Sequence, residues 1–243
     1  YGGVKALVNA DFSMFRDEHI AIVGDNGAGK STFVRNITGV EQPTSGTIFF
    51  NEKIIRFRSP TDARDHGIET VYQNLALADD LDVPANIFLG REIEYFRFGP
   101  LSWLNKSGMR QRSIELLEKT GIKISNIGQP VISMSGGQRQ CVAISRAAGW
   151  DSKLIIMDEP TAALGIQETT KVENIIRGLK DRGIPVIIVS HNLRQVFDLV
   201  DRIVVFRQGK IVGVVDTKEV SGNDVVAMIT GVDKGVHDQA NHM

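Results

Sequence analysis

Residues 24–31 read Gly-Asp-Asn-Gly-Ala-Gly-Lys-Ser and match the phosphate-loop pattern G-x-x-x-x-G-K-[ST] at every fixed position. The stretch follows a short apolar segment at residues 19–23 and precedes a helical pattern at residues 30–38, which ends at Gly39. This strand–turn–helix context is the one that the pattern requires, so a glycine-rich turn without a ligand is the weaker interpretation. The stretch predicts a nucleoside triphosphate site.

The chemistry of this phosphate loop is that of anion binding. Its glycines let backbone N–H groups surround the β-phosphate, and the start of the following helix favours negative charge. The Lys30 side chain would reach the β- and γ-phosphates, and the Ser31 hydroxyl would ligate Mg²⁺. The residues expected to contact the nucleotide here are Asn26, Gly27, Ala28, Gly29, Lys30, Ser31 and Thr32.

Strand-sized apolar runs alternate with helical patterns on both sides of the loop. Residues 154–157 and 186–189 resemble buried strands, whereas residues 172–179 and 193–200 place apolar side chains at helical spacing. Such alternation predicts an α/β fold with a mostly parallel sheet that is covered on both faces. Three further local patterns predict a half-buried strand at 8–14, a helix that starts after Ser59, and a hairpin that joins 203–206 to 211–215.

The middle of the chain lacks apolar strands between its helical patterns, one of which covers residues 109–118. We therefore expect a helical subdomain at residues 75–150, inserted into a single domain whose α/β core comprises residues 1–74 and 151–233. Within the insert, Gly99-Pro100 and the neighbouring aromatic residues indicate an irregular loop at 96–103. Residues 234–243 form a polar tail.

Composition excludes several classes of protein. The net charge of −1 gives no reason to expect nucleic acid as a partner, and no apolar run approaches the roughly 20 residues of a membrane span. The chain has one cysteine, Cys141, so it cannot form an internal disulfide. A single cysteine is also too few for the usual ligand sets of a structural zinc site, which argues against such a site. The chain starts at Tyr1 without methionine or a signal-peptide pattern, which we interpret as a trimmed fragment of a cytosolic protein.

Two adjacent carboxylates follow the apolar run at residues 154–157. Asp158 would lie at the carboxyl edge of the sheet beside the phosphate loop, where it could hold Mg²⁺ directly or through water. Glu159 could polarise the attacking water. The alternative is a solvated strand end, which the phosphate loop makes less favourable.

A second glycine-bearing segment, Met-Ser-Gly-Gly-Gln at residues 134–138, lies shortly before this strand. Together with the phosphate loop, Gln73, residues 154–159 and His191, this signature segment resembles the nucleotide-binding subunit of ATP-binding cassette transporters along nearly the whole chain. The sequence at residues 67–77 and 161–165 is most similar to the carbohydrate-uptake branch of this family, and within that branch to fructose- and ribose-type importers. The resemblance implies a phosphate-loop NTPase core, an N-terminal antiparallel β subdomain and an inserted helical signature subdomain.

The resemblance also implies roles for individual residues. Tyr1 falls where the family stacks an aromatic ring on adenine, although a frayed terminal residue is the alternative. Gln73 would contact Mg²⁺ and the attacking water, Glu159 would be the general base, and His191 would contact the γ-phosphate. Ser135, Gly136, Gly137 and Gln138 would close over the ATP of a second chain in a head-to-tail pair, because one chain already holds its own phosphates at the loop.

One departure from the family concerns this pairing. After Thr161 the family usually has Ser-Ala-Leu-Asp, whereas this chain has Ala-Ala-Leu-Gly at 162–165. The missing aspartate normally helps to couple the two sites across the dimer, so Gly165 puts that network in doubt. The leucine usual at the start of the signature is Met134 here, an apolar exchange of little consequence.

The leading hypothesis is an ATPase that powers monosaccharide import from the cytoplasmic face of the cell membrane. Its partners would be a second cassette, in a homodimer or a mixed pair, and transmembrane permease subunits, with an external sugar-binding protein reached only indirectly. The permease would dock near residues 75–89, where Leu81, Val83, Ile87 and Phe88 could equally be core. Two alternatives are a soluble cassette ATPase acting on DNA or ribosomes and a non-catalytic ATP-binding module.

Overall fold

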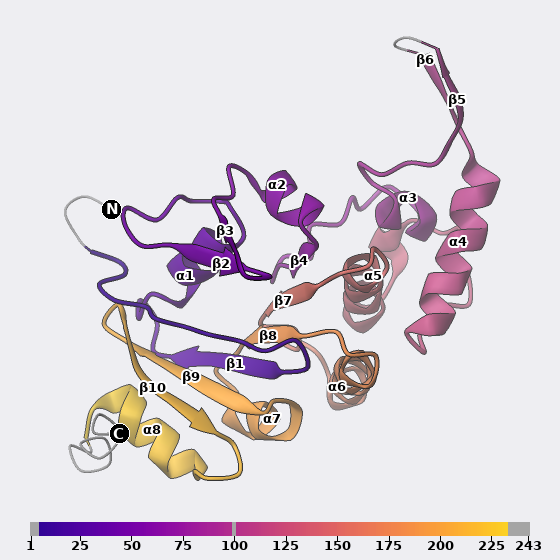
Figure 1. Cartoon of the computed structure of the whole chain (residues 1–243). Helices are drawn as coiled ribbons and strands as arrows, with labels where there is room; N and C mark the ends of the chain where they lie inside the picture. Colours follow the sequence, from indigo (N-terminus) through magenta and orange to yellow (C-terminus); the bar gives the residue numbers. More distant parts are fainter. Residues whose placement is uncertain (1–4, 99–100, 233–243) are drawn as a thin grey trace.

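Six strands form one central sheet in the order β10-β9-β1-β8-β7-β4 (Figure 1). The computed structural model describes residues 5–98 and 101–232. Neighbouring strands run parallel except for β10, which pairs antiparallel with β9 as the predicted hairpin. The prediction of a mostly parallel sheet is confirmed. The strands are β1 (His19–Gly24), β4 (Ile68–Val71), β7 (Leu154–Asp158), β8 (Val186–Val189), β9 (Arg202–Arg207) and β10 (Lys210–Asp216).

Helices cover both faces of this sheet because its strands carry apolar side chains on both sides. Along β1, Ile20 and Ile22 join one core cluster, while Ala21 and Val23 join the other. The first cluster takes in residues of α1 (Lys30–Ile37) and α2 (Pro60–Asp65). The second takes in α5 (Gly136–Ala148), α6 (Ile166–Asp181), α7 (Leu193–Leu199) and α8 (Gly222–Thr230).

This division separates the two glycine-bearing segments. The helix after the phosphate loop is α1, and the helix after the signature segment is α5, so the two helices lie on opposite faces of the sheet. Figure 1 shows α1 and α5 on either side of β7.

A two-stranded antiparallel sheet of β2 (Ile48–Phe50) and β3 (Lys53–Ile55) forms the N-terminal antiparallel part. The strand expected over residues 8–14 does not form, and the structure records only an isolated bridge from Asn9 to Lys210 there. The alternating burial is nevertheless present, since Ala10, Phe12 and Met14 pack against the core. The alternating pattern at residues 8–14 therefore predicted correctly that one side of this segment is covered. The backbone of the segment forms too few hydrogen bonds with a neighbouring strand to count as a strand itself.

Between β4 and β7 the chain leaves the central sheet and forms four helical segments in the described structure. These are α3 (Val83–Ile87), α4 (Lys106–Lys119), the 3₁₀ turn η1 (Val131–Ser133) and α5. Val83, Ile87 and Phe88 are buried and belong to the core. Leu81, at 37% exposure, is the member of that apolar group that faces solvent. The division of the chain at residues 74/75 and 150/151 stays a prediction.

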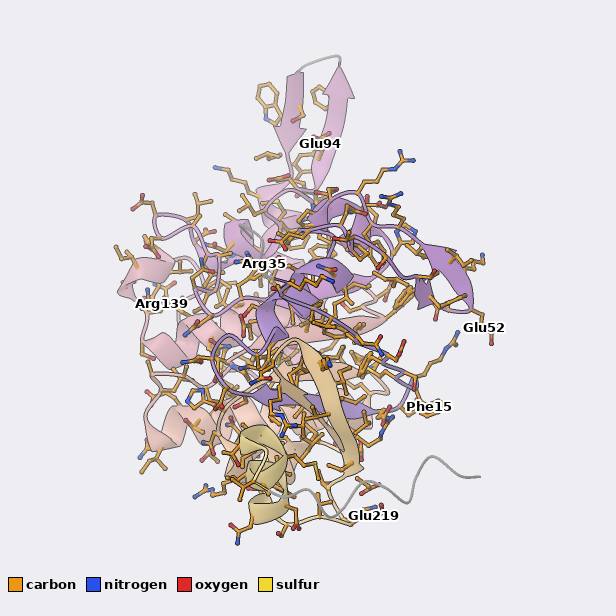
Figure 2. All side chains as sticks on the ribbon, turned by 90° about the vertical axis from the view of Figure 1, so that its left-hand side faces the viewer. Phe15, Arg35, Glu52, Glu94, Arg139 and Glu219 are labelled. Atoms are coloured by element: carbon orange, nitrogen blue, oxygen red, sulfur yellow. The ribbon has the colours of Figure 1, made fainter. Side chains whose placement is uncertain are left out.

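The irregular loop expected at residues 96–103 is wrong, because this segment belongs to a β-hairpin. Strands β5 (Glu94–Phe98) and β6 (Leu101–Leu104) pair antiparallel, and the rings of Phe96 and Trp103 stack with centroids 6.2 Å apart. Figure 2 shows the hairpin standing clear of the body, with Glu94 near its base. Cross-strand stacking of two aromatic rings supports the pairing that the glycine and proline between them obscured.

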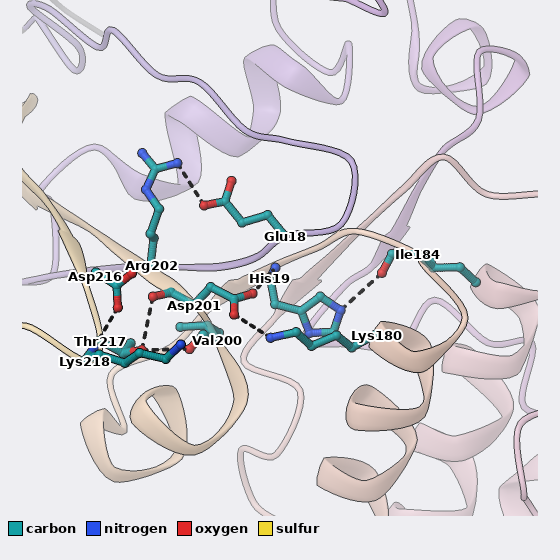
Figure 3. Close-up of polar contacts among 10 residues, drawn as sticks. All are labelled: Glu18, His19, Lys180, Ile184, Val200, Asp201, Arg202, Asp216, Thr217 and Lys218. Atoms are coloured by element: carbon teal, nitrogen blue, oxygen red, sulfur yellow. Dashed lines mark hydrogen bonds and ion pairs between the residues drawn. The ribbon is translucent and has the colours of Figure 1, made fainter.

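A polar cluster ties together the amino ends of β1 and β9 (Figure 3). The Asp201 carboxylate accepts hydrogen bonds from the His19 backbone N–H at 3.0 Å and from Lys180 Nζ at 2.5 Å. The His19 ring is fully buried, and burial lowers its pKa. His19 therefore stays neutral near pH 7 and is a structural residue at the edge of the sheet opposite the phosphate loop.

Candidate functional site

The predicted site lies at the carboxyl ends of four adjacent strands. Because β1, β8, β7 and β4 are parallel neighbours, the segments that follow them meet at one edge of the sheet. The phosphate loop follows β1, and Gln73 lies in the turn after β4. Asp158 ends β7 with Glu159 directly after it, and His191 follows β8. The fold therefore brings together residues from four separate parts of the sequence.

The phosphate loop depends on its glycines for its shape. Gly27 and Gly29 have φ angles of 78° and 104°, which other residues adopt only with strain. A Cβ atom on Gly29 would lie 2.8 Å from the Ala6 carbonyl oxygen, so the backbone also packs too closely for a side chain. The amino end of α1 follows directly, and its first backbone N–H groups are directed towards the loop.

The Lys30 side chain folds back onto the backbone of the phosphate loop. Its Nζ donates hydrogen bonds to the carbonyl oxygens of Gly24 at 2.6 Å and Asp25 at 2.8 Å. Burial lowers the pKa of Lys30, while the charges of Glu159, Asp25 and Asp158 act in the opposite direction. The ammonium group is thus held near the carboxylates of Asp158 and Glu159 at the carboxyl end of β7.

Asp158 and Glu159 differ in their surroundings. Burial raises the pKa of Asp158, the neighbouring Glu159 charge raises it further, and Lys30 lowers it. Glu159 has a φ of 49°, and its backbone N–H donates to the Val189 carbonyl oxygen at 2.9 Å. Left-handed backbone in a non-glycine residue is strained and tends to occur at functional sites.

The Glu159 carboxylate pairs with His191, which follows the neighbouring strand β8. His191 Nδ1 lies 2.7 Å from Glu159 Oε1, and the side chains are 78% and 17% exposed respectively. The histidine therefore lies at the open side of the site, while the carboxylate lies deeper. Such a pair can orient a water molecule and accept its proton.

The donor atoms at this edge suit Mg²⁺ only when a nucleotide is bound. Within residues 5–98 and 101–232, no group of three His, Cys, Asp or Glu side chains could hold a metal ion. Asp158, Ser31 and Gln73 offer one carboxylate, one hydroxyl and one amide oxygen. Mg²⁺ is commonly held by one or two carboxylates together with substrate phosphates and water, so these residues fit it as partial ligands.

The signature segment begins α5 with a capping box. Ser135 Oγ accepts the Gln138 backbone N–H at 3.3 Å, and the Ser135 backbone N–H donates to Gln138 Oε1 at 3.0 Å. Ser135 and Gly136 are exposed, whereas Gly137 is buried. The structure does not bring this segment to the phosphate loop of its own chain, since α5 and α1 cover opposite faces. Tyr1 lies outside the described residues.

The family model for the ABC transporter matches residues 7–162. Along 239 residues the chain is 45% identical to the fructose import ATP-binding protein FrcA of Rhizobium meliloti, covering 95% of this chain and 90% of that protein. The chain belongs to the ABC transporter family. Membership makes this cassette an ATP-binding ATPase, as the sequence predicted.

Further relatives agree with this assignment. The cassette is 43% identical over 230 residues to the xylose/arabinose import ATP-binding protein XylG of Sulfolobus acidocaldarius, covering 95% of this chain and 90% of the relative. It is 40% identical to the ribose import ATP-binding protein RbsA 3 of Rhizobium meliloti (strain 1021) and spans 44% of that protein's length.

Solved structures confirm the fold class. A nucleotide-free ATP-binding cassette from an ABC transporter superposes with a TM-score of 0.79 at 27% identity, covering 94% of each chain. An ATP-binding cassette in its ADP conformation gives 0.77 at 27% identity, covering 95% of this chain and 94% of the other.

The cassette also has a cationic cavity that sequence patterns did not indicate. A cavity of about 250 Å³ is lined by parts of α2, β4 and α5 and the start of the segment after Gln73. Three arginines and one glutamate are among its lining residues, so its charged groups sum to a positive value. These residues are Arg64, Glu69, Arg91 and Arg146.

The charges in this cavity are only partly matched. Arg91 pairs with the buried Glu69 at 2.6 Å and lies 4.9 Å above the Trp150 ring. Burial raises the pKa of Glu69, and the hydrogen bond from Arg91 lowers it. Arg146 donates to the carbonyl oxygens of Leu75 and Ala76, while Arg64 Nε is buried without a hydrogen-bond partner in the described structure. The cavity can therefore accept an additional anionic or hydrogen-bond-accepting group.

Proposed function

We propose that this chain is the ATP-hydrolysing subunit of a membrane importer for a monosaccharide. The observation that carries the proposal is the single sheet edge where Lys30, Asp158, Glu159 and His191 meet. The sugar class is supported by the names of the relatives, which are import ATP-binding proteins for fructose, xylose/arabinose and ribose.

In this proposal the phosphate loop binds the triphosphate through its backbone N–H groups and Lys30. The Lys30 ammonium exchanges its present carbonyl partners at Gly24 and Asp25 for phosphate oxygens. Ser31, Asp158 and Gln73 would hold Mg²⁺, which neutralises phosphate charge when it is bound.

Glu159 acts as the general base. Its carboxylate takes a proton from the attacking water as the water oxygen bonds to the γ-phosphorus and the bond to the β-phosphate oxygen breaks, which leaves ADP and inorganic phosphate. His191 is already in contact with this carboxylate and would contact the γ-phosphate. Its exposure fits a side chain that becomes covered only when the site closes.

The complete site needs a second cassette. Ser135, Gly136, Gly137 and Gln138 lie at the start of α5, which covers the face of the sheet opposite α1, so they are suited to the nucleotide of another copy. A homodimer or a mixed pair of cassettes would supply two such composite sites. ATP would hold the pair closed, and hydrolysis would let it open.

Transmembrane permease subunits would dock at the cationic cavity, on the cytoplasmic face of the membrane. No helix in the described part of the chain is long and apolar enough to cross a bilayer. An acidic side chain on a permease loop would meet the positive charge of the cavity, to which Arg64 contributes. A periplasmic or extracellular sugar-binding protein would act through the permease and not through this subunit.

Reconstitution with permease subunits in proteoliposomes tests the function. Purified chain with Mg²⁺ and ATP should release phosphate slowly alone, and faster once the permease and a labelled pentose or hexose with its binding protein are added. Phosphate release that stays absent with every sugar would contradict the proposal, and salt-sensitive stimulation by nucleic acid would favour the DNA or ribosome alternative.

Charge reversal in the cavity should uncouple hydrolysis from transport. Arg64→Glu is expected to reduce sugar uptake by at least about tenfold, because it replaces the attraction for an acidic loop with repulsion. ATP binding by the isolated chain should not change. Lys218→Glu is the matched control, because Lys218 is exposed in the loop before α8. The next residue in this loop, Glu219, lies at the end of the molecule opposite the β5–β6 hairpin (Figure 2). Equal uptake by both variants would show that docking lies elsewhere.

A further inference from the structure

Gly165 is a glycine that its own backbone does not require. It precedes α6 as the N-cap residue with φ −69° and ψ 166°, an extended conformation open to any residue, and it provides no side-chain cap. A Cβ atom at this position would lie 2.7 Å from Glu168 Oε2. The space beside Gly165 is therefore already taken by a carboxylate from the first turn of the same helix.

The same side chain fills the space beside the signature glycine. A Cβ atom on Gly137 would overlap Glu168 Cγ and would lie 2.7 Å from Glu168 Cβ. Unlike the carboxylate end, these atoms lie close to the backbone of α6 and cannot move aside easily. Glu168 thus packs between Gly137 on α5 and Gly165 at the start of α6.

The signature segment and residues 162–166 lie side by side, and both carry exposed residues. Ser135 and Gly136 are exposed on the signature side, and Ala162 and Ala163 are exposed on the other. Beside them Ile166 is 88% exposed, the largest exposed fraction of any large apolar side chain among the described residues. Leu164 lies behind them, with its Cδ2 3.5 Å from where a Cβ atom on Gly136 would be.

We infer that Glu168 is a positioning residue that fixes residues 162–166 against the signature segment, so that both meet a second copy as one rigid surface. Its carboxylate occupies the space that a side chain at position 165 would otherwise occupy. This inference rests on the proposed function, in which that face meets the nucleotide site of the other cassette. The negative charge also stabilises the amino end of α6, which lacks a side-chain cap.

Truncation of Glu168 should weaken pairing without weakening nucleotide binding. In a Glu159→Gln background, which is expected to retain ATP, Glu168→Ala should raise the dissociation constant of the ATP-dependent dimer about tenfold, the size of one coupled interaction. Sedimentation measures the dimer, and a fluorescent ATP analogue measures binding to the monomer. The neighbouring exposed residue supplies the control, Gln167→Ala, which should match the Glu159→Gln parent.

Restoring a carboxylate at position 165 gives the decisive comparison. Gly165→Asp alone should weaken the dimer, because its side chain meets the Glu168 carboxylate, and Gly165→Asp combined with Glu168→Ala should return to within about threefold of the parent. Additive losses, a Glu168→Ala dimer as tight as the parent, or equal losses of monomer binding and thermal stability would overturn the inference. If the Glu159→Gln parent itself forms no ATP-dependent dimer, the proposed function fails and the inference fails with it.

Discussion

Glu159→Gln is expected to lower kcat for ATP hydrolysis by about 10²–10⁴-fold while ATP binding is retained. The amide keeps the shape of the side chain and can still contact His191, but it cannot accept a proton from water. The Glu159 side chain is 17% exposed and lies behind the more exposed His191. This position is one in which the attacking water would be enclosed. Steady-state phosphate release and equilibrium ATP binding, measured on the same preparation, separate the two effects.

The exposed Glu219 provides a control for this exchange. Glu219→Gln should hydrolyse ATP at the parent rate, because that side chain lies in the loop before α8, away from the site. Hydrolysis by Glu159→Gln within about threefold of the parent would place the general base elsewhere.

Lys30→Ala is expected to weaken ATP binding by at least about thirtyfold, which corresponds to roughly 2 kcal/mol for the removal of one charged interaction at a partly buried site. The exchange removes the ammonium group that two loop carbonyls now hold. It should also raise the pKa of Asp158 further, because Lys30 is the group that lowers it. Calorimetric titration with ATP and Mg²⁺ measures the change in affinity.

Lys218→Ala serves as the matched lysine control and should bind ATP like the parent. An unchanged ATP affinity in Lys30→Ala would mean that the loop binds phosphate through its backbone alone. Retained thermal stability in the variant would show that the weaker binding reflects the ligand site and not the fold.

Local patterns predicted most of the sheet and much of the site. The phosphate loop was predictable because its glycine positions, the preceding strand and the following helix are contiguous in sequence. The Ser59 cap was predictable for the same reason, and Ser59 Oγ accepts the Asp62 N–H at 3.2 Å as the spacing required. Asp158 and His191 could be placed at one edge because both follow apolar strands of a parallel sheet.

Other features depend on contacts between distant segments, so no local pattern indicated them. The hairpin at β5 and β6 depends on cross-strand pairing, and its central glycine and proline suggested the opposite. The cationic cavity joins Arg64, Arg91 and Arg146 from three separate segments of the chain. Glu168 matters through its packing against Gly137 and Gly165, which becomes visible only when α5 and α6 lie side by side.

Mixing two inactive chains tests most directly whether each nucleotide site is shared between copies. One chain carries Lys30→Ala, and the other carries Gly136→Asp, which is a suitable signature variant because a Cβ atom there makes only an ordinary contact with Leu164. Half of randomly formed dimers would be mixed, and each would hold one complete site of two, so the mixture should recover about a quarter of parental hydrolysis. A mixture no more active than the two chains assayed separately would contradict the shared site.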